Sequence, residues 1–169
     1  DLAEIGASLA SMREDGTAPQ VVVLQEAFTV EARDIARRSG YRYVAFGPGA
    51  DTPRPNERSI VAPDDFWKGE TIGPVVSSGL VIMSDYKLSD IRMEPFPAGA
   101  CSGYDCLANK GVLSAYVTVP GARQPVQIIT THLNSAKPSG QPEAISRPAY
   151  DEQVRALSDF MAKDSRPES

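Results

Sequence analysis

The stretch VVVLQE, Val21–Glu26, is an apolar and mostly β-branched run that ends in an amide and a carboxylate. Pro19 precedes the run and helix-like sequence follows it, so the run predicts a strand that is buried on both faces. The last residues of such a strand emerge at the edge of the sheet. We therefore expect Glu26 at the mouth of the fold, as an oxygen ligand or acid/base group, or alternatively as a cap of the next helix.

Hydrophobic periodicity predicts the elements around this run. Apolar residues at three- and four-residue spacing predict helices over residues 1–14, 29–39 and 150–163. Apolar or alternating runs predict further strands over residues 41–46, 78–84, 87–96, 111–119 and 126–131. The second helix is expected to begin after the N-cap Thr29 and to end at Gly40. The apolar side of the last helix is expected to comprise Val154, Leu157 and Met161.

Two antiparallel hairpins are expected among these strands. Asp85 and Tyr86 supply a tight turn between strands 78–84 and 87–96. The turn sequence PGARQ, residues 120–124, joins the last two strands. The order of helix, strand, helix, several strands and helix favours a mixed α/β (α+β) layered domain over a purely parallel doubly wound one.

A long polar segment, residues 47–77, separates two of the expected strands. A loop of about thirty residues is typical of a binding loop or a lid rather than of a simple connection. Phe66 and Trp67 lie within it. The favoured interpretation is that they pin the loop to the core, and the alternative is an exposed anchor for an apolar or lipid partner.

The composition is that of one ordinary globular domain. A chain of 169 residues can bury roughly 70% of its unfolded surface. No run approaches the ~20 apolar residues of a membrane span, and no basic-then-apolar leader is present. The formal charge of -5 argues against an extended basic surface for nucleic acid, but it is compatible with an enzyme that uses a local patch and a metal.

The two cysteines, Cys101 and Cys106, lie close together in a segment rich in small residues. Their spacing favours a disulfide, worth about 2 kcal/mol by the chain-entropy estimate, over two free thiols. A lone pair of cysteines without a nearby histidine makes a poor zinc site. A disulfide would indicate a secreted or periplasmic setting.

His132 is the only histidine, and it lies where the apolar run Val126–Thr131 ends. A lone histidine at a strand end is either a satisfied structural residue or a functional one. If the strands that end in Glu26 and His132 are neighbours, a carboxylate and an imidazole meet at one rim. That pair would be a start for metal-assisted phosphoryl chemistry.

Several sequence elements follow one another in the order seen in the endonuclease/exonuclease/phosphatase superfamily, whose fold is that of deoxyribonuclease I. They are VVVLQE at 21–26, SSGLVIMS at 77–84, NKGV at 109–112, THLNS at 131–135, and then Arg147 and Gln153. The segment CSGYDCLANKG, residues 101–111, is similar to the bacterial neutral sphingomyelinase branch. The resemblance covers nearly the whole chain.

This resemblance implies a fold and site roles. The chain is expected to form part of a two-layered αββα sandwich with mixed, largely antiparallel sheets. Glu26 matches the carboxylate that binds the catalytic Mg²⁺, and His132 matches the catalytic histidine that donates a hydrogen bond to the scissile phosphate. Lys110 is expected to assist phosphate binding, or else to be a solvated surface lysine.

The sequence also departs from the family pattern. The strand that ends in a metal-binding asparagine should precede the first helix. The Gly-Asp-x-Asn element and the Asp-His pair, whose histidine is the general base, should follow the last helix, and residues 1–169 contain neither. We therefore expect a single domain over residues 1–169 that is truncated at both ends and inactive by itself.

The resemblance implies that the complete protein is a secreted or periplasmic, Mg²⁺-dependent phosphodiesterase. Its partner would be a phospholipid whose head-group ester it hydrolyses, or another phosphate ester, with peripheral contact to a membrane. The alternatives are a nuclease, a phosphatase on inositol or another small phosphate ester, and a non-catalytic binding domain that keeps the fold. The acidic balance and the cysteine loop favour lipid over nucleic acid.

Overall fold

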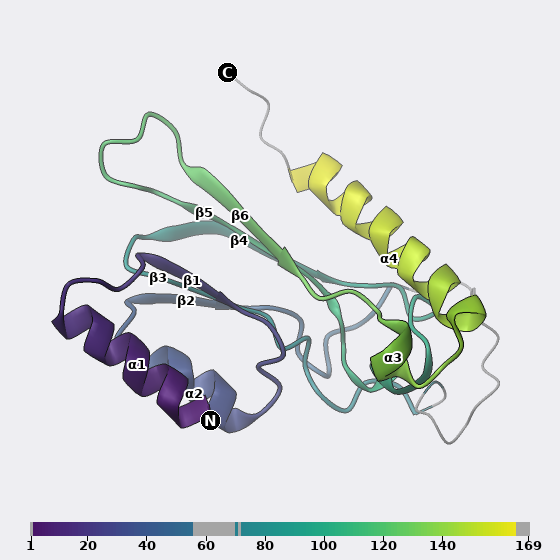
Figure 1. Cartoon of the computed structure of the whole chain (residues 1–169). Helices are drawn as coiled ribbons and strands as arrows, with labels where there is room; N and C mark the ends of the chain where they lie inside the picture. Colours follow the sequence, from purple (N-terminus) through teal and green to yellow (C-terminus); the bar gives the residue numbers. More distant parts are fainter. Residues whose placement is uncertain (1, 56–69, 71, 165–169) are drawn as a thin grey trace.

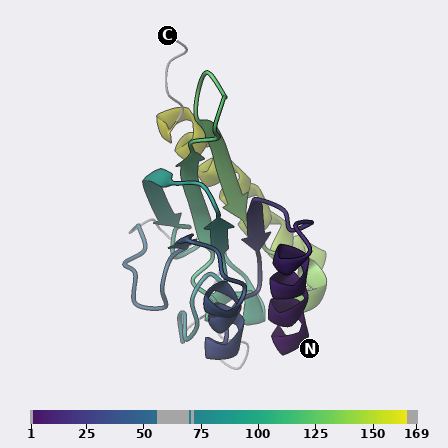
Figure 2. The same ribbon diagram turned by 90° about the vertical axis from the view of Figure 1, so that its left-hand side faces the viewer.

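The chain forms two facing β-sheets with helices on the outer side of each (Figure 1). The computed structural model describes residues 2–55, 70 and 72–164. Helices α1 and α2 cover one sheet and α4 covers the other, and Figure 2 shows α1 and α2 side by side. The predicted α/β class with largely antiparallel sheets is confirmed.

All strand pairs within the two sheets are antiparallel. The first sheet has the order β1-β3-β2, with bounds Val21–Leu24, Val81–Ser84 and Tyr43–Phe46. The second has the order β4-β5-β6, with bounds Leu88–Pro95, Gly111–Val117 and Val126–Thr131. The helices are α1 (Leu2–Glu14), α2 (Val30–Arg38), the 3-10 turn η2 (Gly103–Leu107), α3 (Ala136–Ser139) and α4 (Glu143–Asp164).

Three buried clusters hold these layers together. The cluster between α2 and the first sheet includes Ile35 and Met83. Ile82 and Leu113 belong to the cluster between the two sheets, and Phe160 anchors the cluster beneath α4. Every layer therefore buries an apolar face against its neighbour, as a layered domain requires.

Helix α2 begins and ends where the sequence predicts. The Thr29 side chain accepts a hydrogen bond from the Ala32 amide at 3.1 Å, which satisfies one of the free N–H groups of the first turn. Gly40 has a φ of 78°, the left-handed conformation that commonly ends a helix. The caps place the N-terminus of α2 four residues after Glu26.

The prediction that the run Val21–Glu26 is buried on both faces is wrong. β1 lies at an edge of its sheet, where it pairs only with β3, and Val23 is 41% exposed. The strand that is buried on both faces is β3, all four residues of which are at most 1% exposed. An apolar run indicates a buried strand but does not say which strand of the sheet is central.

The predicted hairpin between the strands around Asp85 is also wrong. β1 and β2 occupy both edges of β3, so β4 pairs with β5 in the other sheet. The turn at Asp85 and Tyr86 instead carries the chain from one sheet to the other. The Asp85 carboxylate anchors this crossing through an ion pair with Arg13 of α1 at 2.5 Å. The hairpin of β5 and β6 is confirmed.

The last helix is longer than predicted. α4 begins at Glu143, seven residues before the predicted start, and contains Pro148. The Ile145 and Ser146 amides both donate to the Pro142 carbonyl and so define a first turn ahead of Pro148. Proline disfavours the interior of a helix, so hydrophobic periodicity after Pro148 does not indicate the helical residues that precede it.

The buried side of α4 also differs from the predicted one. Val154 and Met161 are 40% and 44% exposed, whereas Gln153 and Phe160 are at most 2% exposed. Gln153 replaces an apolar residue on the buried face, so hydrophobic periodicity alone placed that face incorrectly.

Phe66 and Trp67 lie outside the described residues. None of the helices in residues 2–55 and 72–164 is long and apolar enough to cross a membrane.

Candidate active site

Glu26 and His132 meet at one end of the sandwich, although their strands belong to different sheets. β1 and β6 are both edge strands. The Gln25 side-chain amide donates to the Thr131 carbonyl at 2.5 Å and ties the ends of the two strands together. His132 Nε2 then lies 3.4 Å from Glu26 Oε1. The expected meeting of a carboxylate and an imidazole at one rim is thus present.

The Glu26 backbone is in an unusual conformation. Its φ of 57° lies in the left-handed region, which costs free energy for a residue other than glycine. Two backbone hydrogen bonds fix the two residues after Glu26. The Phe28 amide donates to the Glu26 carbonyl at 2.8 Å, and the Ala27 amide donates to the Gly79 carbonyl at 2.9 Å. The Glu26 side chain is 67% exposed, so the strained turn presents its carboxylate to solvent.

The His132 imidazole is partly buried. Desolvation by burial lowers the pKa of His132 below its ordinary value of 6.5, and the charge of Lys110 lowers it further, whereas the carboxylates of Glu26 and Asp105 raise it. The imidazole is therefore neutral at pH 7. The nearby Glu26 carboxylate favours a proton on Nε2. Nδ1 is buried and has no hydrogen-bond partner among the described residues.

Lys110 is buried rather than solvated, so its alternative interpretation as a surface lysine is wrong. Its ammonium lies 3.0 Å from Asp105 Oδ1 and donates to the Leu133 carbonyl at 3.1 Å. Asp105 Oδ2 accepts a hydrogen bond from the Ser135 amide at 2.9 Å. Asp105 thus connects Lys110 to the segment that follows His132, and sequence reasoning did not single it out.

A cavity of about 270 Å³ lies among these groups, hereafter the Glu26–His132 cavity. Its polar lining residues are Glu26, Asp105, Lys110, His132 and Ser135. Its other lining residues are mostly apolar: Phe28, Val76, Tyr104, Leu107, Ala108 and Pro138. A mixed lining of this kind fits a small phosphate ester, which has an anionic centre and an organic group.

Buried side-chain amides form hydrogen bonds that fix the segment after His132. The Asn134 amide donates to Gln153 Oε1 at 2.6 Å, and the Gln153 side chain donates to the Ala100 carbonyl at 2.7 Å. The Asn134 side chain in turn bonds Ser102. These bonds fix the segment after β6, the segment before η2 and helix α4 relative to one another.

The residues present fit a magnesium ion only in part. Mg²⁺ prefers oxygen ligands, keeps several waters and is often bound through one or two carboxylates. The exposed Glu26 carboxylate meets that requirement as one ligand. Within the described ranges, no group of three or more His, Cys, Asp or Glu residues could hold a metal ion.

The titration of His132 tests this arrangement without any metal. Its pKa, measured by NMR on the single imidazole of the metal-free chain, should lie below 6.5. Lys110→Met should raise that pKa and Glu26→Gln should lower it. Because the folded pKa is the lower one, His132 stabilises the fold above pH 6.5, and this contribution is lost as the pH falls through the folded pKa. If the pKa of His132 in both variants equalled that in the wild-type chain, the observed positions of Lys110 and Glu26 around the imidazole would be contradicted.

Comparisons with known proteins identify the fold. No family model and no curated protein matches the sequence. The crystal structure of SmcL matches 96% of this chain with a TM-score of 0.69 and 22% identity, over 51% of its own chain. Beta toxin from Staphylococcus aureus, in a mutant with bound magnesium ions, matches 97% of this chain with a TM-score of 0.68 and 20% identity, over 54% of its own chain.

A beta-hairpin deletion mutant of the same toxin matches 96% of the chain with a TM-score of 0.67 and 23% identity, over 55% of its own chain. The chain spans about half the length of the solved structures that it matches. Over nearly all of its residues, this chain therefore has the deoxyribonuclease-I-like fold that its motifs predict, in the form seen in SmcL and beta toxin.

Proposed function

We propose that the full reading frame containing this chain encodes a Mg²⁺-dependent phosphodiesterase that resembles sphingomyelinase and hydrolyses a phospholipid head-group ester. The observation that carries the proposal is the 3.4 Å approach of His132 Nε2 to Glu26 Oε1 in the lining of one cavity. A carboxylate and an imidazole at one rim suit metal-assisted phosphoryl chemistry.

Each residue of the site has a proposed role. Glu26 would hold Mg²⁺, which when bound supplies a Lewis acid for the phosphoryl oxygens. The neutral His132 donates a hydrogen bond from Nε2 to a phosphoryl oxygen as negative charge builds there. Lys110 contributes positive charge from a buried position, where electrostatic effects are stronger than in water. This chain contributes no assigned general base.

Two observations support the proposal without testing it. A solved structure with the same fold, beta toxin, contains magnesium ions. The disulfide between Cys101 and Cys106 is typical of secreted or periplasmic proteins. Since the matched structures are about twice as long as this chain, the proposed activity belongs to the longer protein, and we expect residues 1–169 alone to be inactive.

Product release tests the proposal. The protein expressed from the full reading frame should release phosphocholine from sphingomyelin vesicles when Mg²⁺ is present and lose that activity in a chelator. Nicking of plasmid DNA, or release of inorganic phosphate from inositol phosphates, would identify the alternative substrates. Absence of turnover on all of these substrates would favour a non-catalytic domain that keeps the fold.

A further inference from the structure

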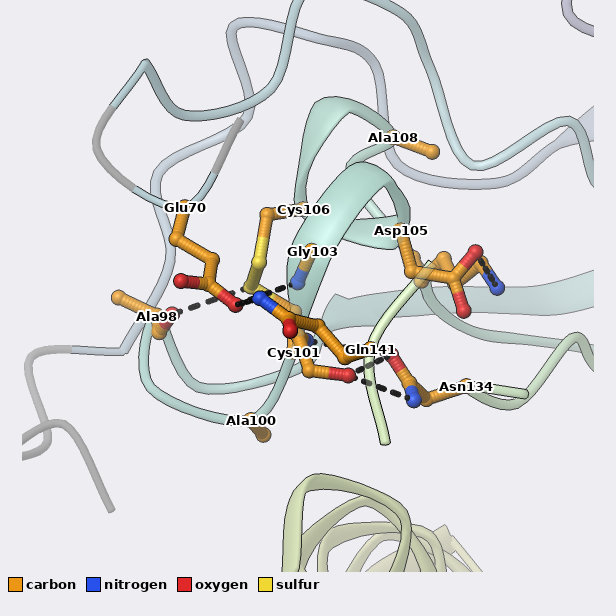
Figure 3. The surroundings of a disulfide bond; sticks show 12 residues. Glu70, Ala98, Ala100, Cys101, Gly103, Asp105, Cys106, Ala108, Asn134 and Gln141 are labelled. Carbon is orange, nitrogen blue, oxygen red and sulfur yellow. Dashed lines mark hydrogen bonds and ion pairs between the residues drawn. A yellow bond between two sulfur atoms is a disulfide. The ribbon is translucent and has the colours of Figure 1, made fainter. Parts of the chain in front are cut away.

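The disulfide between Cys101 and Cys106 encloses the turn that carries two groups of the Glu26–His132 cavity (Figure 3). These groups are the Tyr104 ring and the Asp105 carboxylate, and both lie on η2. Asp105 is 8% exposed and binds both Lys110 and the Ser135 amide. The positions of Lys110 and Ser135 in the cavity lining thus depend on where this short turn lies.

The turn lies directly against the segment that follows His132. Gly103 has a φ of 54°, and a Cβ atom there would lie 1.9 Å from the Ser139 carbonyl oxygen. Only glycine permits this approach. Ser102 adds a hydrogen bond from its amide to Asn134 Oδ1 at 3.2 Å. The turn and the segment 134–141 are therefore packed backbone to backbone.

Glu70 joins the two segments from a third part of the chain. Its Oε1 accepts a hydrogen bond from the Gly103 amide at 2.6 Å and another from the Gln141 side-chain amide at 3.0 Å (Figure 3). A single carboxylate oxygen thus holds the start of η2 and the end of the segment after α3. At the C-terminal end of η2, the Arg54 guanidinium donates to the Ala108 carbonyl at 2.9 Å.

We propose that Glu70 and the Cys101–Cys106 disulfide are positioning groups for the candidate active site. They fix η2 so that the Asp105 carboxylate reaches Lys110 and the Ser135 amide at the same time. Glu70 contributes through its Oε1, which accepts both hydrogen bonds. The consequence for catalysis rests on the proposed function, whereas the consequence for the structure does not.

Physical reasoning gives the effect of releasing the turn. Without the Asp105 carboxylate, the Lys110 ammonium would be buried with only the Leu133 carbonyl as a described partner, and a buried charge that loses its counter-ion is strongly disfavoured. Lys110 would then move, and the Ser135 amide would lose its acceptor. We expect the effect to stay local, because Asp105 and Lys110 bond each other, Leu133 and Ser135 and make no hydrogen bond to β3 among the described residues.

Amide hydrogen exchange on the 169-residue chain tests the structural part without metal or substrate. Glu70→Ala should speed exchange of the Gly103 and Ser135 amides about tenfold. The Gly103 amide loses its acceptor, Glu70 Oε1, directly. The Ser135 amide loses its acceptor, Asp105 Oδ2, because η2 is no longer held in place. Glu70→Gln should retain the protection, since its Oε1 still accepts both hydrogen bonds. Glu14→Ala, an exposed position on α1, is the matched control and should change neither amide.

The disulfide is tested in the same way with Cys101→Ser combined with Cys106→Ser, and independently by reduction of the wild-type chain. In the reduction, a dithiol supplies two electrons and two protons, the S–S bond becomes two thiols, and the dithiol becomes a disulfide. Both treatments should speed exchange at Ser135 and leave the Met83 amide of β3 protected. Unchanged exchange at Ser135 in Glu70→Ala and after reduction would overturn the proposal.

Kinetics on the protein from the full reading frame separate positioning from a purely structural role. Glu70→Ala should raise KM for a soluble phosphodiester, bis(p-nitrophenyl) phosphate, about fivefold or more, with a smaller change in kcat, and Glu70→Gln should restore KM. Equal kinetics for all three proteins would contradict the proposal. If the wild-type protein shows no turnover, the proposed function fails while the exchange result still stands or falls by itself.

Discussion

Replacing Glu26 by glutamine in the protein from the full reading frame should lower kcat for a phosphodiester by about a hundredfold or more. Glutamine keeps the size and the left-handed backbone turn but removes the charge that a magnesium ion needs. The Glu26 side chain is 67% exposed, so the fold should survive. Steady-state rates at several Mg²⁺ concentrations, together with thermal unfolding, measure both effects.

Glu31→Gln is the matched control, because Glu31 is an exposed carboxylate five residues further along the chain. It should leave kcat unchanged. His132→Ala should lower kcat by about 10²–10³, the usual cost of removing one hydrogen-bond donor to a developing oxyanion. Full activity in Glu26→Gln or in His132→Ala would remove that residue from the proposed site.

The two central residues of the site could be found from the sequence because each is a polar residue that ends an apolar run. Their mutual approach could not be derived in that way. β1 and β6 lie in different sheets, and the hydrogen bond from Gln25 to the Thr131 carbonyl links the two strand ends. The prediction that Glu26 and His132 share one site came from the order of the family motifs, because local sequence patterns contain no information about contacts between sheets.

The errors in the predicted fold have a common cause. The turn at Asp85 has the local chemistry of a hairpin, but both edges of β3 are already occupied, by strands that lie far away in the sequence. Asp105 and Gln153 were missed as site residues for a related reason. Both are buried polar side chains, so neither contributes to a hydrophobic pattern. Their hydrogen-bond partners Asn134, Ser135 and Ala100 lie 19 to 53 residues away.

Gln153→Met should lower the free energy of unfolding of the 169-residue chain by about 2–6 kcal/mol, measured by urea denaturation. The volume of the side chain is nearly conserved, so packing changes little. The Asn134 amide and the Ala100 carbonyl, however, would both be left buried without a partner, at about 1–3 kcal/mol each. An exposed glutamine, Gln124 in the turn between β5 and β6, provides the control, and Gln124→Met should change the stability by less than about 0.5 kcal/mol.

The direction of this effect separates two explanations for a fully buried glutamine. If Gln153 only filled space, methionine would be neutral or stabilising, since it is the more apolar residue. If Gln153 fixes the segment after His132 through its two hydrogen bonds, the variant should be less stable and the Asn134 amide should lose its protection from hydrogen exchange. A stable variant with a protected Asn134 amide would mean that Ser102 and Asp105 fix the segment after His132 instead. In that case α4 would pack against the site without positioning its residues.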